Sequence, residues 1–211
     1  MLAVEGLNAW WGQAQALFDV RLQVAQGELV VLQGLNGAGK STLLQALIGI
    51  GPRVQGRIAW DGQPLEAWPA HRRARAGLGF VAEDRRLFTA LSVEDNLWIA
   101  AGPRRTPQAQ QRYAQVMALF PPLQALLQRP ASQISGGEQQ MLALARTLMT
   151  GPRLLLLDEP CEGIAPVLVA AMRDALLQLA QQGMTLLVAE QNQILAAHAH
   201  RVLQLAGGRL A

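Results

Sequence analysis

Cysteine, excess charge and long apolar segments are all scarce in this sequence of 211 residues. Its single cysteine, Cys161, cannot form a disulfide bond within the chain, so we expect a reducing compartment. The 18 lysine and arginine residues exceed the 15 aspartate and glutamate residues by only three, so we expect no nucleic-acid partner. The densest group of basic residues is expected to form a solvated helix face, and it comprises Arg72, Arg73, Arg75, Arg85 and Arg86.

No segment reaches the roughly 18 uninterrupted apolar residues that a membrane-spanning helix requires. The segment 167–180 is largely apolar, but Arg173 and Asp174 interrupt it. Residues 1–5 show neither the basic region nor the long apolar region of a signal peptide. If the protein works at a membrane, we therefore expect other subunits to supply the spans.

Short apolar runs alternate with helical patterns along most of the sequence, which predicts an α/β fold with a mainly parallel sheet. The length fits one domain that spans residues 1–211. From Ser92, a predicted helix N-cap, to about Thr150 the pattern is helical, with breaks at Pro103 and Pro107, and a helical insert is predicted. Strands are predicted at 2–8, 20–24, 29–32, 57–60, 78–82, 154–157, 184–189 and 201–205, and helices at 41–48, 108–120, from Val93 and from Pro166.

A glycine-rich turn lies between the predicted strand 29–32 and the predicted helix 41–48, and it matches the phosphate-binding pattern G-x-x-x-x-G-K-[ST]. The flanking strand and helix argue against a glycine-rich turn that matches by chance. Glycines let backbone N–H groups approach phosphates, and the helix N-terminus adds a favourable dipole. We predict that Lys40 contacts the β- and γ-phosphates of ATP and that Ser41 binds Mg2+. The predicted ATP-binding residues are Gly34, Leu35, Asn36, Gly37, Ala38, Gly39, Lys40, Ser41 and Thr42.

Four consecutive leucines at 154–157 lead into two acids, Asp158 and Glu159. A buried strand would carry Asp158 to the carboxyl edge of the sheet, where we predict that it holds Mg2+. Glu159 is predicted to polarise the attacking water as a general base. Taken alone, this pattern also fits a strand that ends in solvated acids. The phosphate-binding loop upstream favours the catalytic interpretation.

A third motif, residues 135–138, lies between the other two and precedes a predicted helix. Its serine hydroxyl, its glycine N–H groups and the helix N-terminus would form a second phosphate cradle, although a plain helix N-cap is the alternative. The order of the three motifs resembles the ATP-binding cassettes of ABC transporters, whose signature is usually Leu-Ser-Gly-Gly-Gln. The resemblance covers nearly the whole chain. It implies an α/β P-loop cassette with an N-terminal antiparallel β subdomain and a helical subdomain at about 92–150.

The resemblance also implies partners and chemistry. In the family, two cassettes form a head-to-tail dimer, so a second cassette, identical or related, is expected. The expected reaction is ATP hydrolysis with Mg2+, coupled to transmembrane permease subunits and indirectly to a periplasmic solute-binding protein. The expected location is the cytoplasmic face of the inner membrane, as a peripheral subunit. The residues expected to contact the ATP of the other cassette are Ser135, Gly136, Gly137 and Glu138.

Three further positions take their roles from the resemblance. Trp11 stands where the family places an aromatic ring against adenine, although a surface or core tryptophan beside Trp10 is the alternative. Glu83 replaces the usual glutamine near Mg2+, and Gln191 replaces the usual switch histidine. Glutamine can form hydrogen bonds but cannot carry positive charge. ATP hydrolysis should therefore be slower than in cassettes with the histidine if the positive charge of that histidine matters in the transition state. If Glu159 dominates catalysis, the rate should be unaffected.

Several short sequence segments narrow the resemblance to the ATPases of high-affinity branched-chain amino acid importers and their urea and short-chain amide relatives. In that branch, glutamate at position 83 and Glu-Gln-Asn at 190–192 are common. Another ABC transporter, such as an exporter, and a non-transport ABC ATPase are the alternatives. A single cassette without a coiled-coil insert or a basic arm disfavours the non-transport alternative. These segments are residues 83–88, 92–97, 135–143, 162–166 and 190–192.

Overall fold

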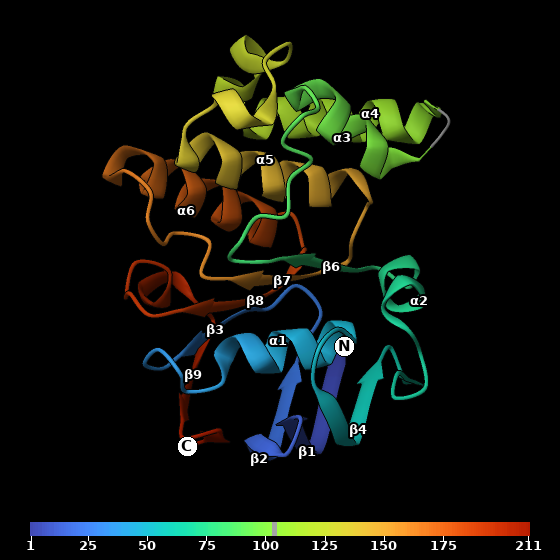
Figure 1. The fold of residues 1–211 in the computed structure, drawn as a ribbon, viewed down its shortest axis with the longest axis vertical. Coiled ribbons are helices and arrows are strands. Elements are labelled where there is room, and N and C mark those ends of the chain that lie inside the picture. Colours follow the sequence, from blue (N-terminus) through green and yellow to red (C-terminus); the bar gives the residue numbers. More distant parts are fainter. Residues whose placement is uncertain (103–104) are drawn as a thin grey trace.

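The structure is a computed structural model that describes residues 1–102 and 105–211. The break expected at Pro103 lies outside these residues. Figure 1 shows a stack in which helices lie above a central sheet, and a further helix separates that sheet from a second one. Among the described residues, no helix combines the length and the apolar character needed to cross a bilayer.

The central sheet has six strands in the order β10-β9-β3-β8-β7-β6. Its inner strands pair in parallel, and only β10 pairs with its neighbour in antiparallel orientation. The predicted mainly parallel sheet is therefore confirmed. The strands are β3 (Leu29–Gln33), β6 (Leu78–Val81), β7 (Leu154–Asp158), β8 (Thr185–Glu190), β9 (Arg201–Ala206) and β10 (Arg209–Leu210).

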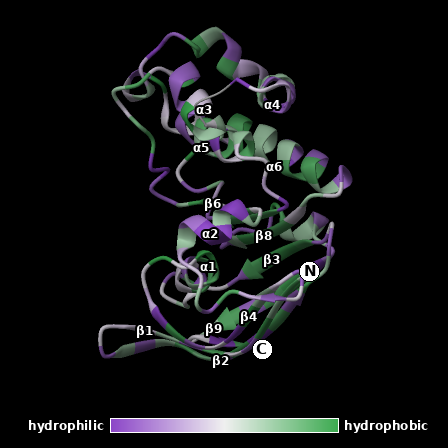
Figure 2. Ribbon diagram, turned by 90° about the vertical axis from the view of Figure 1, so that its right-hand side faces the viewer, coloured by the Kyte–Doolittle hydropathy of each residue, from purple (hydrophilic) through white to green (hydrophobic). Residues whose placement is uncertain are grey.

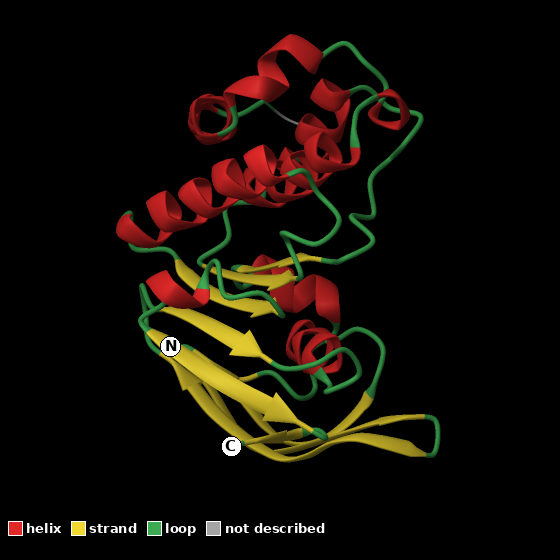
Figure 3. Cartoon of the chain, turned by 90° about the vertical axis from the view of Figure 1, so that its left-hand side faces the viewer, coloured by secondary structure: helices red, strands yellow, loops and turns green. Residues whose placement is uncertain are grey.

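Both faces of the central sheet are covered, which explains why its strands are continuous apolar runs. One face packs Val31 and Leu155 beneath α5 (Gly136–Met149) and α6 (Pro166–Gln181). The opposite face belongs to a second core that includes α1 (Lys40–Ile48). Figure 2 shows the hydrophobic colouring of β3, and Figure 3 shows the helices and sheets in their layers.

The second sheet is antiparallel, with the order β2-β1-β4-β5. Its first two strands are longer than the sequence predicts, because a two-residue turn at Gly12-Gln13 joins them into one hairpin. The backbone N–H of Phe18 donates to the Gly208 carbonyl at 2.9 Å, which ties this sheet to the turn before β10. The strands are β1 (Leu2–Trp11), β2 (Ala14–Val24), β4 (Arg53–Trp60) and β5 (Gln63–Pro64).

The segment predicted as a helical insert contains α3 (Val93–Ala101), α4 (Pro107–Leu119) and two short 3-10 helices, η1 (Pro121–Leu126) and η2 (Ala131–Gln133). Figure 1 shows α3 and α4 on the side of α5 that faces away from the sheets. The predicted N-cap Ser92 is confirmed, since its hydroxyl accepts the Asp95 N–H at 3.0 Å.

The expected solvated helix face is wrong for Arg85 and Arg86, which lie in the loop between β6 and α3, and it is also wrong for Arg73. This residue lies in α2 (Ala70–Arg75) and is only 2% exposed, while its neighbour Arg75 is exposed. The guanidinium donates to the carbonyls of Ala46 and Leu47 at 2.8 Å each and to a third carbonyl before α2. Helices leave their last carbonyls without intrahelical partners, and Arg73 supplies donors where α1 ends.

We predict that Arg73→Met lowers the free energy of unfolding by about 3 kcal/mol, because it removes the donor of the buried Leu47 carbonyl and one of the two donors of the Ala46 carbonyl. Arg75→Met, which removes the same charge from the exposed side of the same helix, should change it by less than about 0.5 kcal/mol. Urea unfolding of both variants checks this. Equal stability of the two variants would contradict it.

Candidate active site

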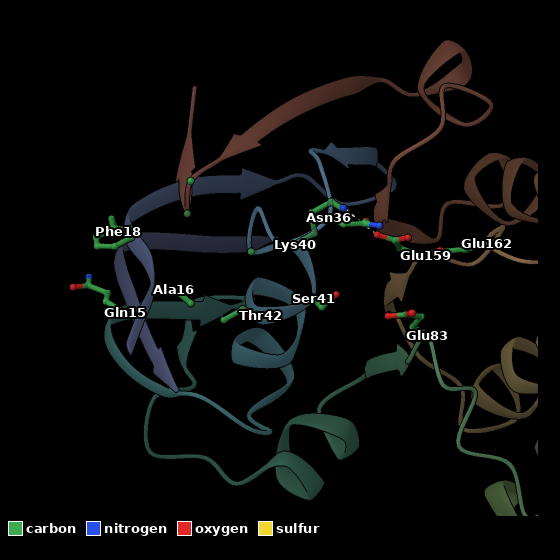
Figure 4. A pocket seen from close by; sticks show the side chains of 14 residues that line it. Gln15, Ala16, Phe18, Asn36, Lys40, Ser41, Thr42, Glu83, Glu159 and Glu162 are labelled. Carbon is green, nitrogen blue, oxygen red and sulfur yellow. Dashed lines mark ion pairs between the residues drawn. The ribbon is translucent and has the colours of Figure 1, made fainter. Parts of the chain in front are cut away.

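The loops that follow β3 and β7 meet at one edge of the central sheet, because both strands pair in parallel with β8. A cavity of about 600 Å³ opens at this edge, and Figure 4 shows the side chains around it. It is lined by residues from β2, the loop before α1, the first turn of α1, and the loops after β6, β7 and β9. The lining residues are Gln15, Ala16, Phe18, Asn36, Gly37, Gly39, Lys40, Ser41, Thr42, Glu83, Glu159, Glu162, Gly207 and Gly208.

Of the predicted ATP-binding residues, Gly34, Leu35 and Ala38 do not line the cavity and the others do. Two glycines of the loop show why it needs that residue. A Cβ atom on Gly34 would lie 2.3 Å from the Leu205 carbonyl oxygen, closer than backbone packing allows. Gly39 adopts a left-handed φ of 107° and would clash with Leu17. No side chain caps the N-terminus of α1, so its first N–H groups and its dipole are available to an anion in the cavity.

Lys40 is 4% exposed and Glu159 is 8% exposed, and each carries the charge that neutralises the other. The Lys40 ammonium lies 2.9 Å from Glu159 Oε1, and it also donates to the Gly34 carbonyl at 2.8 Å and to the Leu35 carbonyl at 3.3 Å. The dashed line in Figure 4 marks the ion pair. A phosphate that binds Lys40 must therefore take the place of the carboxylate and the loop carbonyls.

Asp158 is 2% exposed, and its Oδ1 accepts a hydrogen bond from Ser41 Oγ at 2.9 Å. Burial raises the pKa of Asp158 to about 6, and the bond from Ser41 opposes part of that rise. Glu83 lines the same cavity. Among the described residues, no group of three or more histidine, cysteine or acidic side chains could hold a metal ion. One hydroxyl and one or two carboxylates instead fit Mg2+, which takes its remaining ligands from phosphates and water.

Glu159 has a φ of 46°, an uncommon value for a residue other than glycine, and its N–H donates to the Ala189 carbonyl at 2.9 Å. Burial acts to raise the pKa of the Glu159 carboxyl, but hydrogen bonds from Glu162 and Lys40 outweigh it and hold the value below its usual range. A strained backbone thus directs a charged carboxylate into the cavity, where a general base would be needed.

Glu162 is a cavity residue that sequence reasoning missed as a site residue. Its N–H donates to the Glu159 carbonyl at 3.1 Å, and Figure 4 shows the two side chains close together at the cavity. A hydrogen bond between the two side chains and the charge of Glu159 raise the pKa of Glu162 to about 7. The signal in the sequence was an acid three residues beyond Glu159, close enough for a tight turn to bring the two together.

Trp11 lies at the end of β1 and is 46% exposed, with its indole N–H 3.2 Å from Thr42 Oγ1. Its ring packs over Gly51, where a Cβ atom would lie 2.4 Å away. It is not among the residues that line the cavity, whereas Phe18 is. Its contact with adenine stays a prediction.

The motif at 135–138 begins α5 with a capping box. The Ser135 hydroxyl accepts the Glu138 N–H at 3.4 Å, and the Glu138 carboxylate accepts the Ser135 N–H at 2.7 Å. Gly137 packs so tightly on Leu168 that a Cβ atom would lie 2.2 Å from it. Neither this motif nor the exposed Gln191 is among the residues that line the cavity. The predicted phosphate cradle therefore lies apart from the cavity of its own chain.

Comparison with known proteins agrees with this geometry. The profile of the ABC transporter family matches residues 17–162, which span both the phosphate-binding loop and the acids after β7. This chain belongs to the ABC transporter family. It is 40% identical over 211 residues to the high-affinity branched-chain amino acid transport ATP-binding protein BraG of Pseudomonas aeruginosa, covering 100% of this chain and 91% of the relative. It is 34% identical to the probable branched-chain amino acid transport ATP-binding protein LivF of Archaeoglobus fulgidus, covering 91% of this chain and 82% of the relative.

A solved dimeric ATP-binding cassette, bound to ADP and Pi in a post-hydrolysis state, superposes with a TM-score of 0.88. It is 22% identical and covers 100% of this chain and 96% of its own. The predicted fold, an ABC-type P-loop cassette with an antiparallel sheet, is therefore confirmed. The ABC cassette is an ATP-binding ATPase subunit, as the sequence predicts.

We predict that Asp158→Asn stabilises the nucleotide-free chain at neutral pH. The folded pKa is about 6 and the ordinary value is 3.8, so the folded state binds the proton more tightly. Stability therefore falls as the pH rises from about 4 to about 6, and the full penalty of about 3 kcal/mol applies above that window. Asparagine does not titrate, so the variant should show a higher free energy of unfolding than the parent at pH 7.5 and no gain at pH 4.

The measurement is urea unfolding in metal-free buffer at both pH values. Asp174→Asn, an exposed acid on α6, serves as the matched control and should show no such pH-dependent gain. If Asp158→Asn raised the free energy of unfolding equally at pH 4 and pH 7.5, the burial of a charged carboxylate could not be the cause of the stabilisation.

Proposed function

We propose that this chain energises an ABC importer whose solute is a branched-chain amino acid, urea or a short amide. The observation that carries its catalytic role is the convergence of Lys40, Ser41 and Glu159 on one cavity, with the buried Asp158 bonded to Ser41 behind it. Support for the importer class comes from the 40% identity with BraG along the whole chain. The branch-specific residues Glu83 and Gln191 add to that support.

ATP binding would place the phosphates against the N-terminus of α1 and the ammonium of Lys40. Phosphate oxygens then replace Glu159 as the partner of Lys40, which frees the carboxylate to accept a proton from water. Mg2+, held by Ser41 and Asp158 with Glu83 nearby, would supply charge neutralisation at the phosphates. Gln191 would add a neutral hydrogen bond. The adenine would rest against Trp11, whose ring is half exposed beside Thr42.

A second cassette would complete each site. Ser135 is exposed at the start of a helix, and no residue of the motif 135–138 lines the cavity of its own chain. A partner in head-to-tail orientation would bring these N–H groups and the positive end of α5 to the γ-phosphate. The dimeric arrangement of the solved cassette bound to ADP and Pi supports this proposal.

The permease subunits would dock on the side that carries α2 and α3. A cavity of about 370 Å³ lies there with a mostly apolar lining that includes Ile48, Ile50 and Phe80. Phe88 and Ile99 are exposed by 48% and 52%. Such a surface fits a permease segment that seats apolar side chains in the cavity. With the permease in the inner membrane, the cassette would sit at its cytoplasmic face, and a periplasmic solute-binding protein would act on the far side.

Glu159→Gln should lower the rate of ATP hydrolysis by at least about 100-fold, because the amide cannot accept a proton from the attacking water. ATP binding should persist, since Lys40 and the N-terminus of α1 remain. Phosphate release, measured on the chain with its partner cassette where one is needed, checks this. Asp174→Asn should hydrolyse ATP like the parent. Hydrolysis by Glu159→Gln at more than about a third of the parental rate would contradict the role of Glu159 as the general base.

The importer class predicts which proteins accompany the chain. Purification of the tagged chain from membranes in mild detergent should recover permease subunits. When the recovered complex is reconstituted into vesicles and the solute-binding protein is added, the vesicles should take up a branched-chain amino acid, urea or a short amide in an ATP-dependent way. Mass spectrometry and radiolabelled uptake provide the readouts. Recovery of an exporter complex, of ribosomes or of DNA would contradict the importer assignment and leave the ATPase assignment standing.

A further inference from the structure

The loop between β6 and α3 is strained at Arg85 and Arg86. Their φ values are 60° and 48°, in a region that residues other than glycine rarely adopt. Such strain persists where surrounding contacts enforce it, and it often accompanies a functional role. The loop begins beside Glu83, which lines the nucleotide cavity, so its conformation concerns the active site directly.

Arg85 joins this loop to the first two turns of α5. Its Nη1 donates to Gln139 Oε1 at 2.9 Å, and its Nε donates to Gln140 Oε1 at 3.2 Å. In addition, Arg146 of α5 donates from its Nη2 to the Arg85 carbonyl at 3.2 Å. The guanidinium also lies against the signature motif, since a Cβ atom on Gly136 would be 3.3 Å from both of its terminal nitrogens. One side chain thus spans from the cavity loop to the motif.

Arg86 differs from Arg85 in the contacts that its side chain makes. It follows Arg85 directly, carries the same charge and also has a positive φ. It is exposed, and in the described part of the chain its guanidinium pairs with Asp84 of its own loop at 3.0 Å. The link to α5 is therefore a property of Arg85 and not of basic residues in this loop in general.

We propose that Arg85 is a positioning residue that transmits the position of Glu83 to the signature motif 135–138. Nucleotide and metal that enter the cavity would meet Glu83, and only Asp84 separates Glu83 from Arg85 in the chain, so a movement of one backbone position displaces the other. A shift of the loop therefore moves the bonds to Gln139 and Gln140, and with them the N-terminus of α5. The proposal rests on the proposed function, because only an ATP-dependent dimer uses that motif.

The experiment compares Arg85→Ala, Arg85→Lys and Arg86→Ala, each in the Glu159→Gln chain so that ATP is not consumed. Calorimetry gives the affinity for Mg-ATP, hydrogen–deuterium exchange reports on the peptide 134–140, and light scattering follows dimer formation with ATP. Arg85→Lys keeps the charge but loses the planar fork that reaches two side chains, so it should behave like Arg85→Ala.

For both Arg85 variants we expect ATP affinity within about two-fold of the parent, because the residues 34–42 are untouched. The ATP-induced change in exchange at 134–140 should fall roughly five-fold or more, and ATP-dependent dimerisation, where the parent dimerises, should weaken roughly ten-fold. Arg86→Ala should match the parent in every readout. This separation of ATP affinity from the response of α5 is what a purely structural role would not produce.

Each other result overturns the proposal. The first is that Arg85→Ala matches Arg86→Ala in every readout. The second is that the parent shows no ATP-induced change at 134–140. The third is that Arg85→Ala loses protection throughout β7 and β8, which marks a general loss of stability. Failure of the parent itself to bind ATP is a separate outcome, visible before any Arg85 variant is made. It contradicts the proposed function as well, whereas the first three results leave ATP binding by the chain intact.

Discussion

The buried ion pair between Lys40 and Glu159 is the contact on which the arrangement of the site depends. It joins the start of α1 to the end of β7 at 2.9 Å, and the bond from Ser41 to Asp158 runs beside it at the same length. Charges that are this well buried are costly unless they are paired. The pairing is possible because the parallel sheet brings both strand ends to one edge.

The same ion pair holds the start of α1 to the end of β7, and it is the contact that a bound phosphate would change. Lys40 and Glu159 satisfy each other until phosphates compete for the ammonium. In the mechanism that we propose, ATP binding would then convert Glu159 from a structural partner into a base. Burial raises the pKa of Asp158 to about 6, and the neighbouring Glu159 raises the pKa of Glu162 to about 7, so both carboxylates are costly to keep charged at this site. A bound cation would offset that cost, so stability is given up for function here.

Sequence reasoning succeeded where the signal is local. The strand, glycine turn and helix between Leu29 and Ile48 follow from adjacent residues, as do the leucines and acids of β7 and the cap at Ser92. It failed where a residue's environment comes from distant segments. Nothing near Arg73 indicates that it caps α1, and nothing near Arg85 indicates that it reaches α5. These contacts depend on how elements pack, which periodicity does not report.

Titration of the chain with Mg-ATP by calorimetry, beside Lys40→Ala, tests the central claim most directly. The account predicts one ATP per wild-type chain, and an affinity at least about ten-fold weaker in the variant, since a charge-assisted bond to phosphate is lost and Glu159 is left facing the ligand unpaired. Equal affinity in the two proteins, or no uptake of ATP by the wild type, would contradict the claim that Lys40 exchanges Glu159 for a phosphate.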